Sequence, residues 1–102
     1  MIVIFITCAN KNEARSIARA LVLKRLCACV NIIGNIKSLF WWQGKIDSSA
    51  EALLIAKSKK TKFAKIIKLV KSLHSYEVPE IIALPVIAGE KEYTRWLNHS
   101  IK

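Results

Sequence analysis

Residues 30–59 read VNIIGNIKSLFWWQGKIDSSAEALLIAKSK and carry the strongest indication of the fold. Apolar and polar side chains alternate from Val30 to Ile46, and this two-residue period is typical of a β-strand. Residues 47–49 (Asp-Ser-Ser) predict a turn, and residues 50–59 predict a returning strand. Together they predict a long central β-hairpin.

The two faces of the first hairpin strand differ in character. The face that we expect to point toward the core carries Val30, Ile32, Ile36, Phe40, Trp42 and Ile46. The other face mixes polar side chains with Ile33, Leu39 and Trp41. Gly34 and Gly44 interrupt the alternation and predict bulges or bends.

The length of the hairpin predicts an oligomer. An unbroken strand over residues 30–46 would span about 55 Å, whereas a typical strand has about 5–6 residues. A chain of 102 residues cannot cover such a hairpin with its own helices. Hydrophobic residues make up 53% of the chain, so we expect the excess apolar surface to pack against another copy.

The segments around the hairpin predict two amphipathic helices and two further strands. Residues 2–8 predict a buried strand, and a helix follows from Lys11 to Leu26, with Asn10 and Glu13 in capping-box positions. After the hairpin, a helix is expected over Thr61–Leu73 and a strand over Ile81–Ile87. Pro85 removes a backbone donor, so we expect that strand to lie at a sheet edge or to stop pairing at this residue.

A short third helix is predicted after the last strand, and Tyr93, Trp96 and Leu97 form its one apolar face. The order β-α-β-β-α-β with a terminal helix predicts an α+β, ferredoxin-like fold. We expect residues 1–102 to form a single domain.

The net charge of +10 admits two interpretations. Seven lysines lie between Lys57 and Lys71 with no acid among them, which could indicate an acidic partner such as nucleic acid or anionic lipid. Alternatively, they form the solvated face of an amphipathic helix. The second interpretation is favoured because Lys62, Lys65, Lys68 and Lys71 follow the side opposite the apolar stripe.

The compartment is expected to be cytoplasmic. No apolar segment reaches the roughly 18 residues of a membrane span, and residues 1–8 lack the basic region that precedes a signal sequence. The three cysteines are odd in number, and Cys27 and Cys29 lie too close for an ordinary disulfide. Reduced thiols and no membrane insertion are therefore expected.

Two segments carry side chains that could bind a metal or take part in catalysis. Cys27 and Cys29 could hold a soft metal such as copper or zinc, or they could be small buried hydrophobes. Residues 74–80 (HSYEVPE) offer an imidazole, a phenol and two carboxylates, which suit metal binding or acid–base chemistry. The alternative there is a histidine favoured by the helix dipole, followed by a loop pinned by Pro79.

The sequence lacks the motifs that usually mark several classes of function. The chain has no phosphate-binding glycine loop and no nucleophile elbow, so we do not expect an enzyme, although Cys29 and His74 as nucleophile and base stay an alternative. Residues 51–57 carry no aromatic side chain on which RNA bases could stack. No nucleic-acid partner is therefore expected.

Four blocks resemble the CutA divalent-cation tolerance proteins, and they occur in the order and spacing of that family: ACVN (28–31), WWQGKI (41–46), HSYEVPEIIALP (74–85) and YTRWL (93–97). The resemblance covers essentially the whole chain. It implies a fold similar to the PII signalling proteins, a tight homotrimer, and a link to tolerance of copper and other divalent metals.

The resemblance also implies a site in a cleft between subunits. Its metal ligands would be Cys29 and His74, and its other binding residues Lys57, Tyr76, Glu77 and Trp42. Copper or another divalent cation would be the ligand. A PII-like signalling or anchoring module, which binds a small ligand or protein in that cleft, is the alternative function. Ser75 stands where the family usually has proline.

Overall fold

The computed structural model describes every residue from Met1 to Lys102 and contains one antiparallel sheet. In chain order, the elements are β1 (Ile2–Cys8), α1 (Lys11–Leu23), β2 (Cys29–Trp42), β3 (Lys45–Ser58), a 3-10 turn (Lys60–Lys62), α2 (Phe63–Leu73), β4 (Ile81–Pro85) and α3 (Lys91–Ser100). The strand order across the sheet is β2-β3-β1-β4. The predicted ferredoxin-like fold with a C-terminal helix is confirmed.

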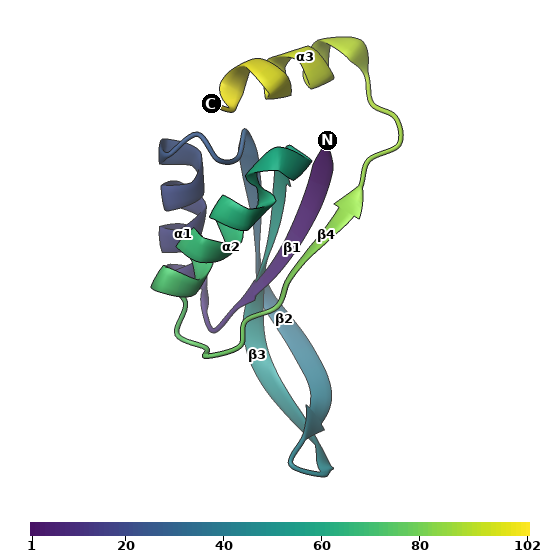
Figure 1. Ribbon diagram of the computed structural model, residues 1–102. Coiled ribbons are helices and arrows are strands. Elements are labelled where there is room, and N and C mark those ends of the chain that lie inside the picture. Colours follow the sequence, from purple (N-terminus) through teal and green to yellow (C-terminus); the bar gives the residue numbers. More distant parts are fainter.

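The core lies between one face of the sheet and the helices α1 and α2, which share that face (Figure 1). Burial alternates along β1, so Ile4, Ile6 and Cys8 are fully buried while the residues between them are half-buried. Burial of each of these isoleucine side chains contributes about 1.5–3 kcal/mol to the free energy of unfolding. We call the other side of the sheet, which neither α1 nor α2 covers, the open face.

Helix α1 begins as predicted but ends three residues earlier. The side chain of Asn10 accepts a hydrogen bond from the N–H of Glu13 (2.8 Å), which caps the first turn. The helix ends at Leu23 because Arg25 adopts a positive φ of 59°, and the N–H of Leu26 then bonds back to the helix (3.0 Å). Glycine usually makes this closure, and no glycine stands in this segment to indicate it.

The hairpin turns at Gln43 and Gly44, so the turn predicted at residues 47–49 is wrong. Gln43 and Gly44 have φ values of 49° and 78°, and two positive φ angles are what a two-residue hairpin turn requires. Residues 47–49 instead lie inside β3 and pair with residues 38–40 of β2. Glycine makes the turn easy because it adopts a positive φ without steric strain.

A bulge in β2 lies between Ile33 and Ile36, next to Gly34 as predicted, with Asn35 at a φ of 57°. The extra residue reverses the side to which every later side chain points. The prediction of one continuous apolar face is therefore wrong beyond the bulge. Beyond it, the open face carries Ile36, Phe40 and Trp42, and the opposite face carries Leu39, Trp41 and Ile46.

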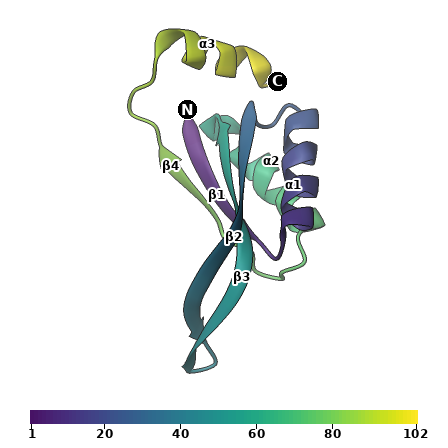
Figure 2. The same ribbon diagram turned by 180° about the vertical axis from the view of Figure 1, so that it is seen from behind.

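The outer half of the hairpin projects away from the helices (Figures 1 and 2). The chain measures 45 × 25 × 23 Å along its principal axes. Five large apolar side chains on this projection are exposed: Leu39, Phe40, Trp41, Trp42 and Ile46. Surface of this kind usually marks a contact with another molecule, which supports the expected oligomer, and the oligomer itself stays a prediction.

The predicted end of the last strand and the predicted start of the second helix each differ from the structure by two residues. Strand β4 ends at Pro85 rather than Ile87, because the chain makes only one more backbone bond, from Val86 to Met1 (3.1 Å), and then leaves the sheet. It lies at the sheet edge, as Pro85 predicted. Helix α2 begins after the 3-10 turn, at Phe63.

Helix α3 lies across the end of the sheet (Figure 2). Of its predicted apolar face, Leu97 is buried, whereas Tyr93 and Trp96 stay exposed with their ring centroids 5.5 Å apart. None of the helices combines the length and the apolar character needed to cross a membrane.

Candidate functional site

Two predicted site residues, Cys29 and Lys57, face each other where β2 begins and β3 ends. The Lys57 ammonium lies 3.9 Å from the Cys29 sulfur and donates a hydrogen bond to the side chain of Asn31. Cys29 is a free, half-buried thiol. We call these three residues the Cys29 corner, and because they alternate with the core residues they lie on the open face.

His74 lies at the opposite end of the sheet, where β1 ends. Its Nε2 is 2.7 Å from the carbonyl oxygen of Thr7, and its Nδ1 accepts a hydrogen bond from the N–H of Tyr76 (3.0 Å). This pattern fits a neutral imidazole with its proton on Nε2. Both ring nitrogens are engaged, so His74 ties the loop after α2 to β1.

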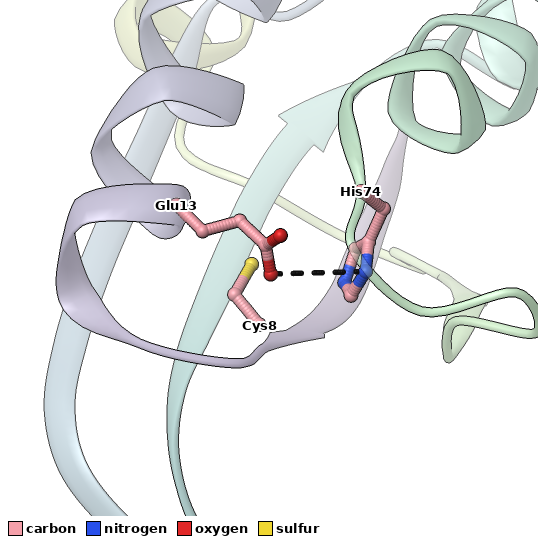
Figure 3. A group of neighbouring side chains, drawn as sticks. All are labelled: Cys8, Glu13 and His74. Atoms are coloured by element: carbon pink, nitrogen blue, oxygen red, sulfur yellow. Dashed lines mark ion pairs between the residues drawn. The ribbon is translucent and has the colours of Figure 1, made fainter.

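Glu13 completes the surroundings of His74. Its Oε2 accepts a hydrogen bond from the N–H of Ala9 (2.8 Å), and its Oε1 accepts one from Ser75 (2.7 Å). Glu13 Oε2 also lies 3.7 Å from His74 Nδ1 (Figure 3). Burial by itself raises the pKa of Glu13, but the backbone hydrogen bonds outweigh it, so this pKa lies below its ordinary value.

Cys8 lies beside Glu13 and His74, and ligand atoms of these three residues all fall within 4.8 Å of one another (Figure 3). Cys8 is fully buried. Burial first, and then the charges of Glu13 and Glu51, raise its pKa to about 12. We call Cys8, Glu13 and His74 the His74 corner.

Cys8 and Glu13 were not predicted from the sequence as members of this group. Glu13 stood out only as part of a capping box, a role that its backbone N–H does play at Asn10. A signal was present in the predicted topology, because a ferredoxin-like order brings the end of the first strand and the loop after the second helix to the same end of the sheet.

The remaining predicted residues are spread around the fold. The hydroxyl of Tyr76 donates a hydrogen bond to Glu51 Oε2 (2.7 Å); burial and then this bond raise the pKa of Tyr76 to about 12. Its ring centroid lies 4.9 Å from that of His74. Glu77 is exposed on the loop, and Trp42 is exposed beside the hairpin turn.

A single subunit does not bring Cys29 and His74 together. Cys8, beside His74, pairs with Ala52 of β3, whereas Cys29 pairs with Lys57. Those two positions of β3 are five residues apart, which corresponds to roughly 17 Å. A site that includes both Cys29 and His74 therefore requires a second subunit, as the family resemblance implies.

The two corners differ in their fitness for a metal. The His74 corner offers a thiol, an imidazole and a carboxylate, which suit copper or zinc. Its imidazole and carboxylate are engaged with backbone groups, however, and its thiol keeps its proton. A cation would have to displace these backbone partners and the thiol proton, whereas a cation from solvent can approach the half-buried Cys29 thiol directly.

The comparisons with known proteins give matches that span nearly the whole chain. The family described as CutA1 divalent ion tolerance protein matches residues 2–100. The divalent-cation tolerance protein CutA of Thermus thermophilus is 45% identical over 98 residues, which cover 96% of this chain and 95% of that protein. The chloroplastic protein CutA 1 of rice, Oryza sativa, is 40% identical over 101 residues, or 99% of this chain.

The length of the relatives varies. The chain spans only 57% of the rice protein and 53% of the mouse protein CutA, but nearly all of the Thermus protein.

Solved structures show the same fold. The Thermus thermophilus Cut A1 structure superposes with a TM-score of 0.97 at 44% identity and covers 100% of both chains. The Archaeoglobus fulgidus structure gives a TM-score of 0.96 at 43% identity with the same coverage, and that protein is described as a periplasmic divalent cation tolerance protein CutA.

Proposed function

Because this chain belongs to the CutA1 divalent ion tolerance protein family, we propose that it acts in divalent cation tolerance by binding the cation as a cytoplasmic homotrimer. Copper is the first candidate because thiol and imidazole ligands suit it. Three free cysteines support a reducing compartment. The exposed apolar residues of the hairpin support assembly.

The proposed metal site lies between subunits, with Cys29 and His74 as ligands and with Lys57, Tyr76, Glu77 and Trp42 around it. The observation that carries this proposal is the accessibility of Cys29. Cys8 and Cys27 are buried, and burial raises the pKa of each to about 12. Cys29 is therefore the thiol best placed to meet a cation that arrives from solvent.

Coordination by His74 has a structural consequence. Its Nδ1 accepts the N–H of Tyr76, so a metal at Nδ1 requires that N–H to leave. The loop that follows α2 would then shift when the metal binds. The hairpin of a neighbouring subunit, which carries Trp42 at its end, is long enough to close such a site.

A copper titration of the purified protein tests the proposal. Cys29→Ala and His74→Ala should each weaken copper binding, whereas Cys27→Ala, which removes a buried thiol, should not. Thermal unfolding of each variant establishes that it is folded. Copper binding that survives both Cys29→Ala and His74→Ala would contradict the site.

Assembly is tested separately by light scattering. A homotrimer should have three times the chain mass of 11.5 kDa. Trp41→Glu, which places a charge on the exposed hairpin, should reduce this mass toward that of one chain. A monomeric wild-type protein would contradict the inter-subunit site.

The second candidate function is a PII-like signalling or anchoring module. The favouring observation is the Cys29 corner, where an ammonium, an amide and a thiol gather on the open face. A small ligand or a protein bound there should raise thermal stability. At a ligand concentration of 100 times Kd the gain is about 2.7 kcal/mol, so a stability screen of metals, nucleotides and small anions separates the two functions.

A further inference from the structure

The positive charge of the chain is concentrated in one layer. Residues 11–26 and 59–73 hold eleven of the seventeen lysines and arginines, and Glu13 is the one acid among them. Six basic and six acidic residues remain elsewhere and cancel, so the whole net charge of +10 comes from these two segments. We call residues 11–26 and 59–73 the basic layer.

The basic layer forms one continuous side of the molecule. Helices α1 and α2 pack on the same face of the sheet (Figures 1 and 2). Their exposed basic residues include Arg15, Arg19, Lys24, Lys65, Lys68 and Lys71. None of these side chains lies within ion-pairing distance of a carboxylate.

Charges of one sign on neighbouring helices repel one another and oppose folding. The layer therefore has a surplus of positive charge that nothing within the chain neutralises. A partner with a dense negative charge would relieve this repulsion on binding.

We propose that the basic layer is a docking surface for an anionic phospholipid membrane, on which the protein lies without crossing it. Eight of the eleven basic residues are lysines, whose hydrated point charges suit diffuse attraction to a charged surface. Leu23, at the end of α1 among these lysines, is 66% exposed. An apolar side chain in that position can enter the headgroup region.

A nucleic acid fits the same layer less well. Its single aromatic residue is Phe63, which packs against the core, so no ring is free to stack on a base. Arginine, which binds phosphate and guanine in a bidentate manner, is the minority cation here. The layer therefore matches the charge of a polyanion without the groups that read bases.

The proposal is independent of the metal site. The basic layer and the open face lie on opposite sides of the sheet, so assembly or ligand binding through the open face would leave the basic layer accessible. Failure of copper binding and failure of membrane binding are thus separate results.

Co-sedimentation with lipid vesicles tests the proposal. Vesicles of equal parts phosphatidylcholine and phosphatidylglycerol should bind the protein at an ionic strength of about 0.15 M, and binding should be lost at about 1 M salt because the charges are then screened. Vesicles of phosphatidylcholine alone should not bind it.

A matched pair of variants locates the surface. Lys65→Gln, Lys68→Gln and Lys71→Gln together remove three charges from the layer and should weaken binding by roughly fivefold per lysine, or on the order of a hundredfold in all. Lys37→Gln, Lys45→Gln and Lys91→Gln remove three exposed charges elsewhere and should have a much smaller effect.

Three results would overturn the proposal. They are absence of binding to the anionic vesicles, equal losses in the two triple variants, and displacement of the protein from vesicles by an equal phosphate concentration of single-stranded RNA or duplex DNA. The last would assign the basic layer to nucleic acid instead.

Discussion

The Cys29 corner and the His74 corner each place a cysteine beside a charged group, yet they are built in opposite ways. In the His74 corner, both imidazole nitrogens and both carboxylate oxygens already have backbone partners, and Cys8 is fully buried. In the Cys29 corner, the thiol is half-buried and its neighbours are two flexible side chains.

The difference separates a group that holds the fold from one that is free to bind. A cluster of metal-type ligands is the stronger candidate by composition, but ligands that are already satisfied must lose their partners before a metal gains them. The Cys29 corner offers fewer ligand atoms, but fewer existing hydrogen bonds would have to break before a metal could bind there.

The largest expected difference is in thiol reactivity. With a pKa of about 12, Cys8 and Cys27 at pH 8 are thiolate in only about one molecule in ten thousand, and burial blocks the reagent as well. Cys29 should therefore react with iodoacetamide at a rate on the order of a thousandfold higher. Mass spectrometry of labelled peptides measures the three rates.

Labelling in denaturant provides the control, because the three thiols should then react alike. If Cys8 in the native protein reacts as fast as Cys29, the His74 corner opens readily and the contrast between the corners is wrong.

The next largest effect is on folding stability in the His74 corner. Glu13→Ala leaves the N–H groups of Ala9 and Ser75 without their charged acceptor, and hydrogen bonds to charged groups are worth about 1.5–3 kcal/mol each. We expect a loss of about 3 kcal/mol in the free energy of unfolding, measured in urea. Glu80→Ala, at an exposed acid, should change it by less than about 0.5 kcal/mol.

The same carboxylate predicts a pH dependence. The pKa of Glu13 is lower in the folded state than its ordinary value of 4.5, so its contribution is fully present above that value and is lost as the pH falls through the folded-state pKa. The stability of the wild-type protein should fall more steeply below about pH 4.5 than that of Glu13→Gln. Parallel curves would show that Glu13 is not held as a carboxylate.

A smaller loss is expected for Tyr76→Phe. This change removes the donor to Glu51, a nearly buried carboxylate, and an unsatisfied group of this kind costs about 1–3 kcal/mol. Tyr93→Phe is the matched control, because the Tyr93 side chain is exposed and its hydroxyl makes no hydrogen bond within the chain. Equal effects of the two changes would show that the Tyr76 bond adds nothing to the stability of this end of the sheet.

The sequence was sufficient to predict the order of the elements, because alternation and helical periodicity are strong along this chain. It was insufficient wherever one residue changes the geometry. Arg25 and Asn35 both adopt positive φ angles. Arginine is not enriched in this conformation, and asparagine indicates it more weakly than glycine does. The bulge at Asn35 then reversed the predicted faces of Phe40 and Trp42.

The candidate sites were predictable only in part. Residues 74–80 stood out by their chemistry, and His74 and Tyr76 do lie at a cluster of polar contacts. Cys8 and Glu13 did not stand out, because their meeting with His74 depends on contacts between segments about 60 residues apart in the chain. The pairing of Cys29 with Lys57 likewise depends on the register between β2 and β3, which the misplaced turn had shifted.

The smallest expected effect comes from the Cys29 corner itself. Lys57→Gln removes the ammonium beside Cys29 and Asn31, but the partners that it leaves are a thiol and an exposed amide. Water can solvate these groups on the open face, so no buried group is left unsatisfied. The free energy of unfolding should change by less than about 0.5 kcal/mol in the same urea experiment. A loss of the size expected for Glu13→Ala would show that both corners hold the fold, and the accessible thiol would then no longer distinguish a binding site from a structural one.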